Sequence, residues 1–216
     1  MELKKRLSKI FEGSKVDMII LYNDDEPTPN FRYLTDFKSG TFEGNFLVAT
    51  KEKEYLFTSD LEYYTAKSQS SGEIEVLNTL GDKKKFDQKF SIIKGKKIGI
   101  NEHETSVAVY NFIKKYKPKG IKDVTKNFTK ARLVKDDSEI SNIRKAVSIT
   151  KFAILEVQKS LREGLTELEV AAQVDFAMRS LGANGTAFET IVAFGKNAAL
   201  PHHMPDSTRL KKDDIV

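Results

Sequence analysis

The 216-residue sequence has no cysteine, no tryptophan and only five prolines. Without cysteine, neither a disulfide framework nor a thiolate metal site can form, so any metal would need histidine or carboxylate ligands. The apolar stretches are short, and one of the longest, residues 16–22, is far below the roughly 20 residues that a membrane span requires. Residues 1–6 lead into no apolar signal core. These absences predict a folded cytoplasmic protein that is not a membrane protein.

The charge is mildly positive, with 36 Lys and Arg against 31 Asp and Glu. Lysines gather in short runs at residues 83–85, 94–97 and 114–119, but acidic residues are interspersed and no nucleic-acid-binding motif is recognisable. We therefore predict a solvated surface rather than a nucleic-acid interface. Hydrophobic residues make up 39% of the chain and no low-complexity tract occurs, which argues against disorder.

The first half of the sequence alternates helix and strand patterns. Residues 2–13 place Leu3, Leu7, Ile10 and Phe11 at helical spacing before Gly13. Apolar runs bounded by polar turns predict strands at residues 16–22, 44–49, 54–58, 73–77 and 97–100, with a last short strand and turn within 119–128. Further helices are predicted at residues 60–67, 84–93 and 106–116. This order predicts an α/β domain with a mixed sheet.

From Ser138 the apolar residues follow a helical period up to Gly164. Thr166 and Glu169 then form a capping-box pattern, which predicts a second helix ending near Gly182. Residues 186–195 are rich in β-forming residues and predict a strand, and residues 215–216 look like the start of another. We expect a first domain at residues 1–127, a linker at 128–137 and a second domain at 138–216.

Four segments, in order, resemble blocks of one protein family. Residues 30–37 (NFRYLTDF) are similar to its Asn-x-x-Tyr-Leu-Thr-Gly-Phe signature, with Asp36 where glycine is common. The other blocks are ARLVK…EI…IRKA at residues 131–146, GLTE at 164–167 and FETIVAFGKNAALPH at 188–202. Together they resemble the prolidase and aminopeptidase P type of metallopeptidase, in the family that also contains creatinase and methionine aminopeptidase.

The resemblance implies a creatinase-like N-terminal α/β domain with a mixed sheet, followed by the incomplete start of a pita-bread α+β catalytic domain. It also implies an exopeptidase, often dimeric, that cleaves proline-containing peptides with two divalent ions (Mn, Co or Zn). In the family two Asp, one His and two Glu hold these metals, and the first Asp would follow directly after Val216. We therefore expect no metal to bind this chain and the chain alone to be inactive.

The resemblance places His202 at the family's Leu-Pro-His position. Its implied role is to donate a hydrogen bond to the scissile carbonyl or to the gem-diolate formed on attack. His203 is the alternative if the alignment is shifted by one residue, so both are candidate substrate-binding residues, and both could also be plain loop residues. His103 lies beside Glu102 and Glu104, but the adjacent spacing lacks the i, i+4 geometry of a helical metal site, so we predict a surface loop.

Some residues admit a structural reading and a functional one. Phe188 and Phe194 could line a proline pocket, but we predict that they pack in the core. Tyr33 is predicted to be a buried tyrosine with a hydrogen-bonded hydroxyl rather than a site residue. Two other functions remain open from the sequence: a metal-free relative that acts as a binding module, and a creatinase-like hydrolase. The sequence does not separate dipeptidase from aminopeptidase.

Overall fold

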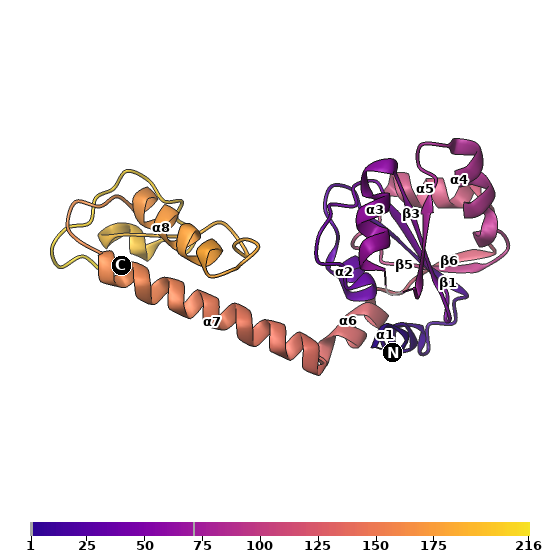
Figure 1. Ribbon diagram of the computed structural model, residues 1–216, viewed down its shortest axis with the longest axis horizontal. Coiled ribbons are helices and arrows are strands. Elements are labelled where there is room, and N and C mark those ends of the chain that lie inside the picture. The colour runs from indigo at the N-terminus through magenta and orange to yellow at the C-terminus, as the bar shows by residue number, and fades with distance from the viewer. Residues whose placement is uncertain (1, 71) are drawn as a thin grey trace. The chain divides into compact units, whose positions relative to one another are not determined.

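The computed structural model describes residues 2–70 and 72–216 (Figure 1). The chain divides into two compact units, Met1–Val134 and Lys135–Val216. Among the described residues, no helix has both the length and the apolar character needed to cross a membrane.

The first unit is built on a six-stranded sheet with the strand order β4-β3-β2-β1-β5-β6. The strands are β1 Met18–Tyr22, β2 Phe46–Ala49, β3 Glu54–Thr58, β4 Ile74–Asn78, β5 Lys97–Ile100 and β6 Gly120–Asp123. Strands β1, β2 and β3 pair antiparallel, whereas β3 with β4, β1 with β5 and β5 with β6 pair parallel. The predicted mixed sheet is confirmed.

Helices cover both faces of this sheet (Figure 1). They are α1 Glu2–Phe11, α2 Pro29–Thr35, α3 Asp60–Gln69, α4 Lys83–Phe90, α5 Val107–Lys115 and α6 Thr125–Leu133, with a short 3₁₀ turn at Ser91–Ile93. Alternate side chains of β1 enter different cores, as the two-residue strand period requires. Ile19 packs with α1, α2 and α6, whereas Ile20 packs with α4 and α5. The unit therefore has three layers and two apolar cores.

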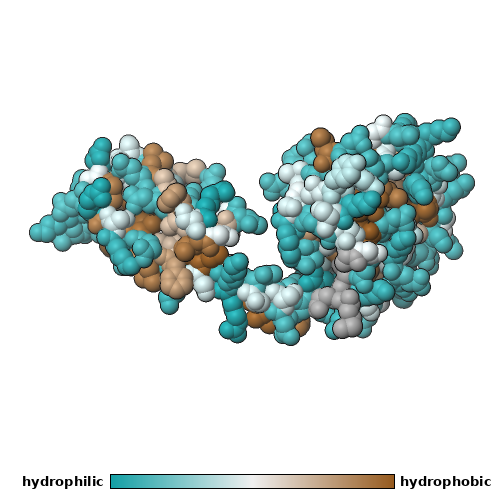
Figure 2. All heavy atoms as spheres, in the orientation of Figure 1, coloured by the Kyte–Doolittle hydropathy of each residue, from teal (hydrophilic) through white to brown (hydrophobic). Residues whose placement is uncertain are grey.

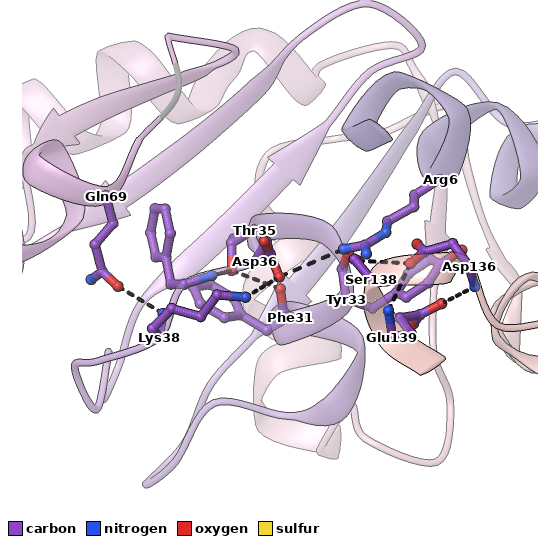
Figure 3. A network of polar contacts seen from close by, with 11 residues as sticks. Arg6, Phe31, Tyr33, Thr35, Asp36, Lys38, Gln69, Asp136, Ser138 and Glu139 are labelled. Atoms are coloured by element: carbon purple, nitrogen blue, oxygen red, sulfur yellow. Dashed lines mark hydrogen bonds and ion pairs between the residues drawn. The ribbon is translucent and has the colours of Figure 1, made fainter. Parts of the chain in front are cut away.

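The second unit contains two long helices, α7 Asp137–Ser160 and α8 Glu167–Ser180, and a 3₁₀ turn η2 at Gly195–Ala199. Capping boxes begin both helices. At α7, Asp136 and Glu139 each accept a hydrogen bond from the other's backbone N–H at 2.9 Å (Figure 3). At α8, Thr166 and Glu169 form the predicted box. Each box satisfies N–H groups that the first helical turn would otherwise leave unpaired.

The core of the second unit joins the C-terminal half of α7 to α8 and the residues that follow. Its buried members are Val157, Leu165, Val170, Val192, Phe194 and Leu210. Other apolar side chains of the two helices are exposed: Val147 is 62% exposed and Phe176 is 73% exposed. Figure 2 shows such apolar residues, in brown, at the surface of this unit.

The structure differs from the sequence predictions in two helices and two strands. Helices α2 and α6 were not predicted, although Thr28 caps α2 and Pro29 occupies its first turn, which is a favoured arrangement for a helix start. The strand predicted at residues 186–195 does not form, and residues 215–216 are not a strand either. Strand formation depends on a neighbouring strand as well as on propensity. Here Val192 and Phe194 pack instead into the helical core.

Candidate functional site

The signature segment at residues 30–37 forms α2 and ties it to the rest of the first unit. Arg6 Nη1 donates a hydrogen bond to the Tyr33 carbonyl oxygen at 3.0 Å, and the guanidinium lies 5.0 Å from the Tyr33 ring centre (Figure 3). The Tyr33 hydroxyl donates to the Ala131 carbonyl oxygen at 3.1 Å. Tyr33 is therefore a buried tyrosine with a hydrogen-bonded hydroxyl, as predicted.

Asp36 shows why the signature commonly has glycine at its place. Its φ of 56° lies in the left-handed region, where it ends α2, and its N–H donates to the Arg32 carbonyl oxygen at 2.8 Å. Glycine adopts this conformation most readily, and Asp is among the few other residues that tolerate it. Lys38 Nζ lies 2.5 Å from the Asp36 carboxylate (Figure 3). The departure from the signature thus keeps the backbone geometry.

Asn30, the first signature residue, has its side chain between two distant segments. Its Nδ2 donates to Glu104 Oε1 at 2.9 Å, and its Oδ1 accepts from Arg132 Nη1 at 3.0 Å. Asn30 is only 2% exposed. The two contacts join α2 to the loop after β5 and to α6, so this part of the signature acts as a structural connection.

The candidate site itself lies in the second unit, where Glu167 holds the histidine segment. Glu167 is in the first turn of α8 and is 0% exposed. Its carboxylate accepts four hydrogen bonds, two on each oxygen: from Phe194 N at 2.8 Å and Asn197 Nδ2 at 3.0 Å on Oε1, and from His203 Nε2 at 2.6 Å and Asp206 N at 3.0 Å on Oε2. One buried carboxylate therefore fixes residues 194–206 at both ends.

The hydrogen bonds also decide the charge of Glu167. Burial by itself raises the pKa of this carboxyl, but the hydrogen bonds from His203, Asn197, Phe194 and Asp206 outweigh burial and lower the pKa to about 2. Hydrogen bonds to the ionised form stabilise it in this way. Glu167 is therefore an anion at neutral pH.

Glu167, His203 and Asp206 are close enough in space to suggest a metal site, because one ligand atom of each lies within 4.8 Å of the others. The donor set does not fit a divalent ion. Both oxygens of Glu167 already accept two hydrogen bonds each. A metal would have to displace the N–H groups of Phe194 and Asp206, for which the described residues offer no other acceptor. We interpret the Glu167 carboxylate as a structural anion held by hydrogen bonds, and we derive no metal chemistry from this cluster.

The two adjacent histidines have different surroundings. The His203 side chain is 10% exposed and is held by Glu167, whereas His202 is exposed. Both histidines line a pocket of about 590 Å³. Its other lining residues are Phe188, Glu189, Thr190, Ile191, Pro201, Met204 and Pro205. The predicted pair thus lies at one mainly apolar pocket.

Of the other residues that the sequence analysis considered, one lines this pocket and the others lie elsewhere. Phe194 is 1% exposed and belongs to the core, as predicted, but Phe188 is 74% exposed and lines the pocket, so its core assignment was wrong. His103 is exposed in a loop, as predicted. Glu167 was missed as a site residue because an acidic residue in the first turn of a helix is common for electrostatic reasons alone.

Each of the two units matches a known protein family. The creatinase/prolidase N-terminal domain model matches residues 4–134, and metallopeptidase family M24 matches residues 141–216. An Xaa-Pro dipeptidase from Pyrococcus horikoshii is 30% identical over the whole chain, which spans 58% of that relative.

Solved structures agree with the sequence relatives. An Xaa-Pro dipeptidase from Bacillus anthracis has a TM-score of 0.83 at 26% identity, covering 99% of this chain and 58% of its own. An X-Pro aminopeptidase from Thermotoga maritima has a TM-score of 0.82 at 26% identity, covering 95% and 58%. The chain therefore spans less than two thirds of these relatives. It belongs to the creatinase/prolidase family, with the family's N-terminal domain followed by a segment of metallopeptidase family M24.

Proposed function

We propose that the chain is part of a metal-dependent exopeptidase that cleaves peptides at Xaa-Pro bonds. The observation that carries the proposal is the position of His202, exposed at a pocket whose walls include Phe188, Ile191, Pro201 and Met204. Apolar walls with a few placed polar groups are typical of sites that bind small organic ligands. A prolyl ring is apolar and compact, and the adjacent imidazole offers the polar group.

In this proposal His202 donates a hydrogen bond to the carbonyl oxygen of the scissile bond. Negative charge grows on this oxygen as the tetrahedral intermediate forms, so a fixed donor stabilises the transition state more than the substrate. The family's divalent metal pair, for which we propose Mn, Co or Zn, would supply the hydroxide nucleophile. The Glu167 cluster does not fit a metal, so we propose that other residues of the enzyme hold this pair.

The relatives carry names of both dipeptidases and an aminopeptidase. The test below therefore has to distinguish a dipeptide substrate from a longer peptide. We further propose a cytoplasmic homodimer. A metal-free binding module and a creatinase-like hydrolase are the competing functions.

The test is hydrolysis by the full gene product and by the 216-residue chain, with Mn²⁺, Co²⁺ or Zn²⁺ added. The substrates are an Xaa-Pro dipeptide, an Xaa-Pro-Yaa tripeptide and creatine. We expect the full gene product to cleave one of the proline peptides and the 216-residue chain to cleave none. Cleavage of the dipeptide alone would identify a dipeptidase. Hydrolysis of creatine alone, or peptide binding without hydrolysis, would contradict the proposal.

His202 is tested in the same assay. His202→Asn should lower kcat/KM by about 10²-fold or more, the usual effect of losing one donor to a developing oxyanion. His103→Asn is the matched control, because His103 is an exposed histidine of the first unit. An equal loss of kcat/KM in both variants would show that His202 has no specific role in the reaction.

A further inference from the structure

His202 and His203 are neighbours, but only His203 contacts Glu167. The four groups that bind the Glu167 carboxylate lie on both sides of His202 in the sequence: Phe194 and Asn197 before it, His203 and Asp206 after it. A segment held on both sides by one rigid group has few ways to move. The position of His202 relative to α8 is therefore set by a residue that lies 35 positions earlier in the sequence.

The start of α8 strengthens this connection. The N–H groups of Glu167 and Leu168 donate to the carbonyl oxygens of Thr208 at 3.1 Å and Asp206 at 3.2 Å. The segment after the histidines thus binds both the side chain and the backbone of the first helical turn. The positive end of the helix dipole also favours the ionised form of Glu167.

Only a carboxylate satisfies all four donors. A glutamine at this position has one acceptor oxygen and one NH₂ group. If the oxygen faces Phe194 and Asn197, the NH₂ group faces the N–H of Asp206, and two donors then oppose each other. The site therefore distinguishes Glu from Gln although the two side chains have nearly the same shape.

We propose that Glu167 is a positioning residue for His202: it holds residues 194–206 through His203 and three other donors, so that His202 faces the pocket, and it is not a metal ligand. The catalytic part of this inference rests on the proposed peptidase function. The structural part does not, and it can be measured on the 216-residue chain.

The first experiment follows amide hydrogen exchange in this chain by NMR. Glu167→Gln should accelerate exchange at Asp206 by about tenfold or more, because a hydrogen bond to a charged acceptor is lost. The Phe194 amide should be affected less. Glu169→Gln is the matched control: Glu169 lies in the same helical turn, and its capping contact is to Thr166. Unchanged exchange at Asp206 in Glu167→Gln would overturn the proposal.

His203→Phe provides a second variant if Glu167→Gln does not fold. It removes one of the four donors and keeps the carboxylate. We expect the His202 imidazole resonances to shift and the Asp206 amide to exchange faster, whereas unchanged spectra around His202 would contradict the positioning role. Titration of the wild-type chain with Zn²⁺ or Mn²⁺ tests the other claim. Metal-induced changes at His203 that disappear in Glu167→Gln would make Glu167 a metal ligand and overturn our inference.

The second experiment measures peptide hydrolysis by the full gene product. Glu167→Gln should lower kcat more than it raises KM. The double variant with His202→Asn should be no slower than His202→Asn alone, because both changes remove the same contribution. Losses that multiply would show that Glu167 acts independently of His202 and would overturn the proposal. If wild type hydrolyses no proline peptide, the proposed function fails, while the exchange data still decide whether Glu167 holds the segment.

Discussion

The hydroxyl of Tyr33 donates a hydrogen bond to the carbonyl oxygen of Ala131 at 3.1 Å, across 98 positions of the sequence. Both residues are buried, with 6% and 3% exposure. Ala131 lies in the last turn of α6, where carbonyl groups have no partner within the helix. The signature around Tyr33 and the ARLVK segment therefore meet in space, and the tyrosine satisfies a helix end.

Tyr33→Phe should destabilise the first unit by about 1–3 kcal/mol, because it leaves a buried carbonyl oxygen without its donor. Urea unfolding followed by tyrosine fluorescence can measure this effect, since all seven tyrosines lie between residues 22 and 116 and report on the first unit. Tyr64→Phe is the matched control, because Tyr64 is 77% exposed. Equal midpoints for the two variants would contradict the prediction.

Asn30→Ala should destabilise the first unit by on the order of 2 kcal/mol, because it removes the partner of both Glu104 and Arg132. The same urea assay applies. Adding Glu104→Ala to Asn30→Ala should cost less than the sum of the two single changes, since the unpaired carboxylate is then gone. Asn111→Ala, at an exposed position of α5, is the control. Strict additivity would show that Asn30 and Glu104 are not energetically coupled, contrary to the prediction.

Glu54 should make the first unit less stable as the pH rises. It is 0% exposed, neither carboxylate oxygen has a hydrogen-bond partner among the described residues, and burial together with the nearby charge of Glu73 raises its pKa to about 8. The folded chain keeps this proton up to about pH 8, while the unfolded chain releases it near the ordinary value of 4.5. The free energy of unfolding therefore falls between these two pH values and levels off above them.

Glu54→Gln should remove this pH dependence. At pH 9 the variant should be more stable than wild type by at most on the order of 5 kcal/mol, and at pH 4.5 the two should be similar. Urea unfolding at pH 4.5, 7 and 9 measures the difference. Glu52→Gln, at an exposed position in the same hairpin, should change little. A wild-type stability that rises from pH 5 to pH 9 relative to Glu54→Gln would show that the buried carboxyl is ionised in the folded chain, contrary to the prediction.

Local patterns predicted most of the regular elements. The bounds of β3 and β5 match the prediction, since each is a short apolar run between polar turns. The capping box of α8 was also readable, because it depends on two residues three positions apart. Helix α6 was missed because its pattern is weak and its N-cap residue, Val124, has an apolar side chain that makes no cap hydrogen bond. Its packing on α1 and the bond from Tyr33 stabilise it instead.

The candidate site was only partly predictable. The resemblance identified His202 and His203, but it did not show which of them is held and which is exposed. That difference depends on Glu167, whose partners lie 27 to 39 positions away. The sequence alone marks Glu167 as a helix-start residue. Phe188 was assigned to the core because it lies in a run that predicts a strand. Since that strand does not form, the side chain is not carried into the core.

The second unit should respond to pH in the opposite direction from the first. Hydrogen bonds lower the pKa of Glu167 to about 2 in the folded chain, against an ordinary value of 4.5. The folded state thus binds fewer protons than the unfolded state in this interval, so the stabilisation is complete above about pH 4.5 and is lost as the pH falls towards 2.

Amide signals of α8, followed by NMR at pH 6, 4 and 3, should show progressive loss of exchange protection. Glu167→Gln should start from lower protection and depend less on pH. Glu169→Gln should keep the part of the pH dependence that Glu167 causes and lose only the part of the exposed Glu169 carboxyl, whose pKa is lowered by its hydrogen bonds with Thr166. Protection that is constant down to pH 2.5 in wild type would mean that the Glu167 carboxylate does not stabilise this unit, and the positioning of His202 would then need another cause.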